Sequence, residues 1–461
     1  MKTKNMKVIR VMVLAAGFIA VLSLIAEART VKLTCDGQRS ITAAVERLKP
    51  GDTLLVEGAC VENAVIPEKV VDVVVHGQGV ATINGPDPTK ASVTVSGRNI
   101  TIQNFGSITG GREGVLVDQG GTATITNNVI HGTGNTAIRV SNAGFAAIAL
   151  NILENNVGNG IAIDNHSSAY IGFLSLSDTT ASPNTIQNNN NGIIILQSSS
   201  ARIQGNTISG NRLNGITVSE NSEARIGFRS GSAGTFSAPN VIQNNQAAGI
   251  LVNRSSSARI TGNTIINNTG GGVALNDGST ADIGSVGGEG GPNTITGNGG
   301  AGANARDGVT VARSSSAAVE GNIINNNTRD GVRIFRAAQA NVSSNTINSN
   351  GGDGIFLAEN SGVNIEGANS TTSNNTGFGL RCVRGSYASG TVTTGGSGTA
   401  ADSLSGNSGA KSFGATLTVM VAEGTGNSSF GPVADSDGST FTVSPNGTVV
   451  LNSEGCVDNT N

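Results

Sequence analysis

The chain has 461 residues, a formal net charge of −3 and 13% charged residues, which excludes the basic surface that nucleic-acid-binding proteins carry. Aromatic residues make up 3% and tryptophan is absent, so a polysaccharide groove lined by aromatic stacking platforms is not expected. The 66 glycines indicate many tight corners, because glycine adopts positive φ angles without steric cost.

Residues 1–28 have the organisation of a signal peptide. An apolar stretch at residues 11–26 is followed by the small-residue cleavage pattern Ala26-Glu27-Ala28. The positive charges before it are those of Lys2, Lys4, Lys7 and Arg10. We expect a secreted or periplasmic mature chain that begins at Arg29 and has no stable membrane anchor. A single membrane anchor is the alternative, but the apolar stretch is shorter than a usual span.

Residues 29–90 are expected to form an N-terminal cap and the first coils. Ser40 is placed to cap a short helix that runs through Leu48, and Pro50-Gly51-Asp52 ends it before a strand at residues 53–56. The apolar face of this helix consists of Ile41, Ala44, Val45 and Leu48. Such a helix covers the first coil, whose open strand edge would otherwise pair with another chain.

Residues 91–384 repeat one pattern every 23 residues, which begins with a small residue and Ile or Val and ends at an Asn-x-Ile corner. The starting pairs are Gly114-Val115, Ala137-Ile138, Gly160-Ile161, Gly192-Ile193, Gly215-Ile216, Gly249-Ile250, Gly272-Val273, Gly308-Val309, Gly331-Val332 and Gly354-Ile355. The pattern predicts three short strands per unit, and stacking at about 4.8 Å joins the apolar residues of the units into one core. We therefore predict an all-β solenoid of about 13 coils.

Four cysteines gain meaning from the predicted export, because an oxidising compartment favours pairing. Cys35 and Cys60 are 25 residues apart, close to one coil, so stacking brings them together. Cys382 and Cys456 would then form a disulfide at the other end. The alternative is that some of the four remain buried thiols.

Asparagine and serine recur at fixed corners of the repeat. The corner asparagines are Asn128, Asn151, Asn206, Asn263, Asn322 and Asn345. Stacked amides hydrogen-bond along a solenoid, so a structural ladder is expected, with a sugar-binding amide row as the alternative. The serine runs at 198–200, 255–257 and 314–316 predict another turn ladder. His76, His131 and His166 fall at unrelated positions of the repeat, so no shared metal site or nucleophile-base pair is expected.

Several segments carry a family resemblance. The helix followed by Pro50-Gly51-Asp52-Thr53-Leu54-Leu55-Val56, then His76-Gly77-Gln78-Gly79 and the asparagine-rich coils, resemble the right-handed parallel β-helix proteins of the pectin-lyase-like superfamily. The resemblance implies a single-stranded right-handed parallel β-helix with a short N-terminal capping helix. It leaves function open, because the superfamily includes lyases, hydrolases, epimerases, and phage and surface binding proteins.

The enzyme motifs of that superfamily can be tested against this sequence. Polygalacturonase-like members carry Asn-Thr-Asp, Asp-Asp, Gly-His-Gly or Gly-His-Asp and Arg-Ile-Lys motifs, and mannuronan epimerase-like members carry Tyr-Gly-Phe-Asp-Pro-His; all are absent here. Pectate-lyase-like members need a looser pattern of clustered carboxylates for calcium and a basic residue, which the sequence does not exclude.

Three aspartates fit that looser pattern. Asp307, Asp330 and Asp353 precede Gly at the same position of successive coils, and Arg306, Arg329 and Arg333 are nearby cations for binding. Stacked carboxylates either hold Ca²⁺ or supply an acid and a base for polysaccharide chemistry. The alternative is turn chemistry, because equivalent coils carry Asn159, Asn191 and Asn214 at this position.

Every second coil is longer than 23 residues, as the distances between starts at 160 and 192, 215 and 249, and 272 and 308 show. The extra residues follow Ile171-Gly172, Ile226-Gly227 and Ile283-Gly284 and end in Pro-Asn at 183–184, 239–240 and 292–293. Loops at one corner line up along one flank of a solenoid, where a ligand-facing wall is expected. Duplication of a two-coil unit without a selected function is the alternative.

After residue 384 the repeat is lost, and residues 385–461 are expected to form irregular C-terminal coils or a cap. The sequence thus favours an exported, non-catalytic β-helix that binds a polysaccharide or a cell-surface protein, with no firmly implied cofactor. The alternative function is a polysaccharide lyase, hydrolase or epimerase that uses the three aspartates, with Ca²⁺ as a possible cofactor.

Overall fold

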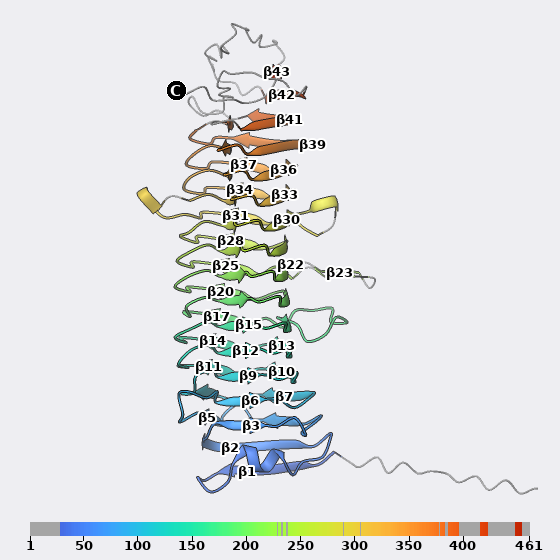
Figure 1. Cartoon of the computed structure of the whole chain (residues 1–461), viewed down its shortest axis with the longest axis vertical. Helices are drawn as coiled ribbons and strands as arrows, with labels where there is room; N and C mark the ends of the chain where they lie inside the picture. The colour runs from blue at the N-terminus through green and yellow to red at the C-terminus, as the bar shows by residue number, and fades with distance from the viewer. Residues whose placement is uncertain are drawn as a thin grey trace, which may run out of the picture.

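The computed structural model describes residues 28–227, 229–231, 234–236, 238–288, 290–304, 306–377, 379–382, 386–395, 415–422 and 448–453. They form a rod of stacked coils (Figure 1). Each regular coil contributes one strand to each of three lengthwise faces, as the three apolar segments per repeat predict. The predicted signal peptide lies outside the described residues. Of the helices in the described ranges, none is long and apolar enough to cross a membrane.

Face 1 is a parallel stack that includes the strand before each Asn-x-Ile corner. It consists of β1 (Thr30–Cys35), β2 (Thr53–Val61), β4 (Val74–His76), β7 (Ile100–Gln103), β10 (Thr122–Thr126), β13 (Phe145–Ala149), β16 (Ser168–Ile171), β19 (Ser200–Ile203), β22 (Glu223–Gly227), β27 (Ser257–Thr261), β30 (Thr280–Gly284), β33 (Ser316–Glu320), β36 (Gln339–Ser343), β39 (Gly362–Ser373) and β41 (Tyr387–Gly395).

Face 2 follows face 1 around each coil. The long strands β2 and β39 run from face 1 into face 2 and so connect the two faces. It consists of β5 (Thr82–Asn84), β8 (Ser107–Thr109), β11 (Val129–His131), β14 (Ile152–Glu154), β17 (Thr185–Gln187), β20 (Thr207–Ser209), β25 (Val241–Gln243), β28 (Thr264–Ile266), β31 (Thr294–Thr296), β34 (Ile323–Asn325) and β37 (Thr346–Asn348).

Face 3 is a separate sheet of 13 parallel strands, which agrees with the predicted number of coils. It consists of β3 (Ala64–Ile66), β6 (Val93–Val95), β9 (Val115–Val117), β12 (Ile138–Val140), β15 (Ile161–Ile163), β18 (Ile193–Ile195), β21 (Ile216–Val218), β26 (Ile250–Val252), β29 (Val273–Leu275), β32 (Val309–Ala312), β35 (Val332–Phe335), β38 (Ile355–Ala358) and β40 (Leu380–Cys382).

The core fills the inside of the rod because inward and outward side chains alternate along each strand. In β18, Ile193 and Ile195 are fully buried, whereas Ile194 between them is partly exposed. Equivalent residues stack directly on one another, as Ile148 and Ile171 of face 1 do. One continuous column of buried Ile, Val, Leu and Ala results, as the 23-residue pattern predicts.

The N-terminal cap has the predicted helix, although it is shorter than expected. The helix α1 (Ile41–Val45) begins where the Ser40 hydroxyl accepts a hydrogen bond from the Ala43 amide, and Ile41 and Val45 are buried against the first coils. Cys35 and Cys60 form the predicted disulfide between neighbouring strands. The expected pairing of Cys382 with Cys456 falls outside the described residues.

Three turns separate the faces: corner A from face 1 to face 2, corner B from face 2 to face 3, and corner C from face 3 to face 1. In corner A the backbone N–H of each asparagine from Asn128 to Asn322 donates to the amide oxygen of the asparagine in the next coil. This ladder comprises Asn128, Asn151, Asn184, Asn206, Asn240, Asn263, Asn293, Asn322 and Asn345. Asn184, Asn240 and Asn293, which the sequence placed at the ends of insertions, are therefore ladder members.

Corners B and C have ladders of their own. The corner B ladder was not predicted and comprises Asn156, Asn189, Asn211, Asn245, Asn268, Asn298, Asn327, Asn350 and Asn375. The serine ladder of corner C includes Ser199, Ser256 and Ser315 from the predicted serine runs. Structural stacking thus explains the recurrent asparagines and serines.

The insertions leave face 1 at corner A on one side of the rod (Figure 1). The second contains the antiparallel pair β23 (Arg229–Gly231) and β24 (Gly234–Phe236), and the third the 3-10 turn η1 (Val286–Gly288). The prediction was incomplete for the third, because this coil has another excursion in corner B, at η2 (Gly302–Asn304), which projects from the other side of the rod.

The Ile-Gly pair at each insertion has a steric cause. Gly227 has a φ of 103°, and a Cβ there would collide with the Thr261 carbonyl oxygen. Gly172 and Gly284 meet the same obstacle at Gln204 and Glu320. Each insertion therefore begins where only glycine fits.

The C-terminal part continues face 1 before the repeat is lost. β41 pairs in parallel with β39, although the register shifts between Ile365 and Ser370. β42 (Ala415–Ala422) adds in parallel to β41, and β43 (Thr448–Ser453) is antiparallel to β42. The irregular coils or cap expected after residue 384 can be compared with the structure over these strands only.

Candidate functional site

The three predicted catalytic aspartates form a buried ladder in corner B. Asp307, Asp330 and Asp353 immediately precede the face 3 strands β32, β35 and β38 and are 1%, 3% and 5% exposed. The backbone N–H of Asp330 donates to Asp307 Oδ1 at 3.3 Å, and that of Asp353 donates to Asp330 Oδ1 at 2.8 Å. The predicted stacking of these side chains is therefore observed.

Arginines neutralise this ladder. Arg329 donates from Nε and Nη2 to both carboxylate oxygens of Asp307 at 2.7 and 2.6 Å. Arg333 Nη1 donates to Asp330 at 2.7 Å. Of the three arginines predicted to bind, these two join the ladder, whereas Arg306 lies in corner B with its Nη1 donating to the Ala303 carbonyl at 3.1 Å.

Burial and charge change the protonation of the ladder. Burial, followed by the neighbouring Asp307 carboxylate, raises the pKa of Asp330 to about 6. The hydrogen bond to Asp307 raises the pKa of the Arg329 guanidinium above its ordinary value. This arrangement is that of a buried ion-pair network, in which each carboxylate already has its partners.

The aspartates are also covered on the outside. The Arg333 guanidinium lies over the Phe356 ring at 4.1 Å from its centroid and 5.3 Å from that of Phe335. Asp330, to which Arg333 donates, therefore lies behind this arginine and the two rings. Within the described ranges, no group of three or more His, Cys, Asp or Glu side chains is arranged to hold a metal ion.

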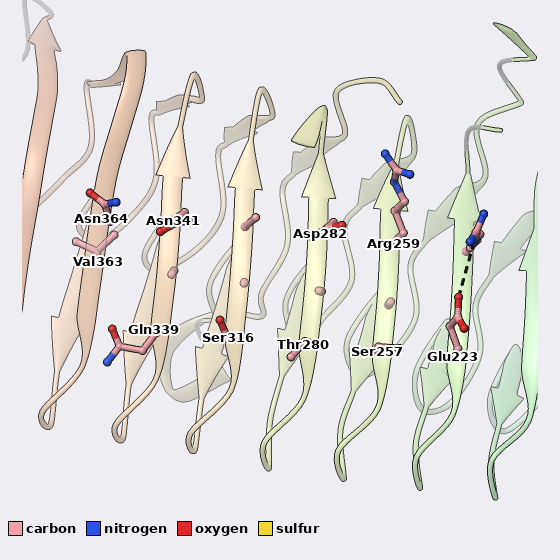
Figure 2. Close-up of a pocket in the computed structure, with 16 residues that line it drawn as sticks. Glu223, Ser257, Arg259, Thr280, Asp282, Ser316, Gln339, Asn341, Val363 and Asn364 are labelled. Carbon is pink, nitrogen blue, oxygen red and sulfur yellow. Dashed lines mark ion pairs between the residues drawn. The ribbon is translucent and has the colours of Figure 1, made fainter. Parts of the chain in front are cut away.

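A groove on face 1, by contrast, is lined by polar and charged side chains on the surface of the rod. It encloses about 540 Å³ over six neighbouring strands, β22, β27, β30, β33, β36 and β39. Its outward side chains stand in two rows across the strands (Figure 2). One row holds Glu223, Ser257, Thr280, Ser316 and Gln339, and the other holds Arg225, Arg259, Asp282, Ala318, Asn341 and Asn364. Between the rows the inward positions are occupied by buried alanines such as Ala258 and Ala317, so that the backbone of the strands forms the floor of the groove.

The second row begins in an arginine column that extends beyond the groove. Arg202, Arg225 and Arg259 stack in register on β19, β22 and β27. Glu223 lies 3.7 Å from Arg225, and Asp282 stands opposite Arg259 on the next strand. Arg202 has no hydrogen bond or ion pair to any described residue. Like charges stacked on neighbouring strands repel one another, so the column favours an anionic ligand.

Aromatic side chains stand at the head of this column. Tyr170 on β16 occupies the same row one coil before Arg202. Its ring packs edge-to-face on Phe145 at 5.1 Å and stacks on Phe173 at 4.9 Å. The low aromatic content therefore does not exclude an aromatic surface next to the arginines.

The insertions begin close to the arginine column. Arg225 lies two positions before Gly227, where the second insertion leaves face 1, and the first and third insertions leave at the equivalent ends of β16 and β30. The insertions thus follow the edge of face 1 that carries the arginine row. This position agrees with the predicted wall along one flank.

Sequence reasoning missed these arginines, although a signal was present. The tripeptide Ala-Arg-Ile occurs at residues 201–203, 224–226 and 258–260, always at the same position of the repeat. Its isoleucines are buried in the core, and the core pattern alone entered the prediction. The outward residue of the same tripeptide is the arginine that stacks on face 1.

Comparison with known proteins agrees with this fold. The sequence profile of the family described as "Right handed beta helix region" matches residues 168–285 and 284–395. No curated protein matches the chain in sequence.

Solved structures with a similar fold include enzymes and a phage protein. The periplasmic alginate epimerase AlgG is 14% identical over 76% of this chain and 83% of its own, with a TM-score of 0.46. An alginate lyase from Paenibacillus sp. str. FPU-7 is 16% identical over 70% of this chain and 95% of its own, with a TM-score of 0.30. Tailspike protein 3 of bacteriophage CBA120 is 10% identical over 91% and 67%, with a TM-score of 0.31.

These likenesses concern the fold alone and assign no activity. The family match covers the central and C-terminal coils, and the same three-strand coil continues through the N-terminal part. The chain therefore has the fold of a parallel β-helix, and residues 168–395 carry the right-handed β-helix region that defines the matching family.

Proposed function

We propose that this protein is an exported, non-catalytic binding protein that holds an acidic polysaccharide along face 1. The observation that carries the proposal is the stack of Arg202, Arg225 and Arg259 on successive strands. A guanidinium group donates two parallel hydrogen bonds to a carboxylate or sulfate, so the stack presents such donors about every 4.8 Å along the rod.

The rest of the groove suits a carbohydrate. Beyond Asp282 the outward residues are neutral, and most have hydrogen-bonding side chains, among them Gln339, Asn341 and Asn364. Amides and hydroxyls both donate and accept, and so match sugar hydroxyls. A polymer lying along the groove would meet arginines at one end and amides at the other.

The carboxylates of the groove support binding rather than hydrolysis. Glu223 and Asp282 are on strands two coils apart, which is about 10 Å on the strand spacing. Carboxylate pairs that hydrolyse glycosides lie roughly 5–9.5 Å apart. Both residues also stand beside an arginine of the column.

Export is part of the proposal. The organisation of residues 1–28 supports it, and the Cys35–Cys60 disulfide is typical of an oxidising compartment. Processing of the secreted protein at Ala28, detected by N-terminal sequencing, is the result we expect. A cytosolic chain with an intact N-terminus would overturn this part of the proposal.

The binding proposal is tested with a polymer panel. We expect purified protein to retard in affinity gels that contain polyuronates such as alginate or polygalacturonate, but not in gels that contain neutral dextran. Retardation should weaken with added salt, because ion pairs at an exposed surface are screened. Release of unsaturated or reducing products is followed in parallel. Cleavage of a polyuronate, or equal retardation by dextran, would contradict the proposal.

A further inference from the structure

A second pocket lies on face 3, in the N-terminal coils. It encloses about 230 Å³ and is bordered by strands β3, β6, β9 and β12. Its apolar side is formed by Val65, Ala91 and Leu116, and its charged side by Lys90, Arg112, Glu113 and Arg139. This volume is smaller than the roughly 300 Å³ at which pockets for drug-sized ligands begin, so it suits a single small ring.

Glu113 is the unusual residue of this pocket. It precedes β9 at the position that Asp307 occupies before β32, and its side chain is 3% exposed. Asp307 and Asp330 each accept a backbone N–H from the next coil. Glu113 Oε1, by contrast, has no hydrogen-bond partner, and among the buried side-chain atoms of the described residues that lack one it is the only carboxylate oxygen.

The neighbouring arginines do not complete the coordination of Glu113. Arg112 Nε is 3.5 Å from Oε1 and Arg139 Nη1 is 3.7 Å away, and neither makes a hydrogen bond to it. Arg139 is directed instead at Asp164, to which it donates from Nε at 2.8 Å and Nη2 at 3.2 Å. A buried carboxylate without a hydrogen-bond donor costs free energy, which a ligand hydroxyl in the pocket would offset.

The charges around this acceptor define the ligand. Lys90, Arg112 and Arg139 line the pocket, but Lys90 lies 3.2 Å from Asp87 and Arg139 is paired with Asp164, so Arg112 is the cation left to receive an anionic group at the rim. Arg112 is half exposed and placed at the opening. A ligand must therefore combine a hydroxyl donor, an anionic group and an apolar face that can lie on Leu116 and Val65.

We propose that this pocket binds one sugar-acid residue. A ring hydroxyl donates to Glu113 Oε1, the sugar carboxylate pairs with Arg112 at the rim, and the apolar face of the ring rests on Leu116. The site is separate from the face 1 groove, whose strands begin at β22. The proposal for one site therefore does not depend on the proposal for the other.

The test uses D-glucuronate as the probe and the full protein. Titration followed by calorimetry or ligand-observed NMR is expected to give a dissociation constant on the order of 1 mM, as a ligand of this size allows. Glucose, which lacks the carboxylate, should bind at least tenfold more weakly. The variant Arg254→Gln/Arg313→Gln, which removes two positive charges from exposed ion pairs in corner C, should bind glucuronate as the wild type does.

Two variants decide the residue assignment. Glu113→Gln keeps the size of the side chain and should weaken glucuronate binding at least tenfold; Arg112→Gln at the rim should weaken it severalfold and serves if Glu113→Gln does not fold. Equal binding of glucose and glucuronate, unchanged affinity in the folded variants, or no saturation at tens of millimolar glucuronate would each overturn the proposal.

Discussion

Corner B and face 1 both carry charged side chains stacked on successive coils, but the two stacks have opposite surroundings. In corner B, Asp307 and Asp330 are buried and paired with Arg329 and Arg333. On face 1, Arg225 is more than half exposed and its nearest carboxylate is 3.7 Å away. A stacked charge thus indicates a binding site where, as at Arg225, the side chain is exposed and not held in a buried ion-pair network.

A second contrast, within corner B itself, explains why the aspartates are there. Asn191 accepts the backbone N–H of Asn214 at 3.2 Å, as Asp330 accepts that of Asp353. The corner therefore requires an acceptor and not a charge. Aspartate satisfies this requirement at the cost of burying a charge, which the arginines compensate.

Removing an aspartate from the corner B ladder should have the largest effect, and this effect is on stability. Asp307→Ala leaves Arg329 and the Thr310 hydroxyl without their acceptor and should lower the free energy of unfolding by about 3–5 kcal/mol. Urea denaturation measures this. Asp282→Ala on face 1 is the matched control, because its exposed carboxylate should contribute less than about 1 kcal/mol. Equal losses would contradict the distinction between the two stacks.

Removing the arginine column should abolish binding without loss of stability. Arg202→Gln/Arg225→Gln/Arg259→Gln deletes three charge-assisted donors and should weaken polyuronate binding about 100-fold or more in affinity electrophoresis. The matched control is Arg254→Gln/Arg313→Gln/Arg336→Gln, which removes the same charge from exposed ion pairs in corner C. Similar weakening in both variants would show that net charge, and not the column, determines binding.

The raised pKa of Asp330 predicts a pH dependence of stability. Its pKa is about 6 in the folded protein against 3.8 ordinarily, so the folded state binds the proton more tightly. The contribution of this tighter proton binding to the free energy of unfolding is complete below about pH 4 and is lost as the pH rises through about 6. Asp330→Asn should lack this fall, so the difference in unfolding free energy between pH 4 and pH 7 should be smaller than in the wild type. An identical profile would disprove the assignment.

The smallest expected effect is on polyuronate binding, when a carboxylate in the face 1 groove is neutralised. Asp282→Asn removes the negative charge opposite Arg259 and should strengthen polyuronate binding by about two- to threefold, since exposed pairs are worth less than about 1 kcal/mol. Glu359→Gln, which changes the same charge at the exposed pair with Arg336, should have no effect. Weaker binding by Asp282→Asn would mean that this carboxylate accepts hydrogen bonds from the ligand.

The coil, its corners and its cap could be predicted from the sequence because their signals are local and periodic. Ser40 capping was predicted from its residue type before an apolar helical face, the Cys35–Cys60 disulfide from spacing and expected export, and the stacking of Asp307 on Asp330 from the repeat. The insertions interrupted the period, and for that reason Asn184 and Asn240 were not recognised as ladder members. The second excursion at η2 was hidden in the same way, since only the total length of its coil is visible in the sequence.

The functional surface was harder to predict, because pairing depends on how side chains cross between coils. Arg329 donates to Asp307 of the preceding coil rather than to its own neighbour Asp330, which is 4.0 Å away. Spacing cannot distinguish a paired carboxylate from one such as Glu113, whose Oε1 has no donor. The burial of each side chain and its hydrogen-bond partners distinguish a structural ladder from a binding site, and only the structure shows them.

The most direct measurement compares polyuronate binding by two folded variants in the same affinity gel. We predict that Arg225→Gln/Arg259→Gln loses at least tenfold in affinity while Asp330→Asn binds as the wild type does. Loss of binding or the appearance of lyase activity that depends on Asp330, with Arg225→Gln/Arg259→Gln unaffected, would place the functional site in corner B and contradict this account.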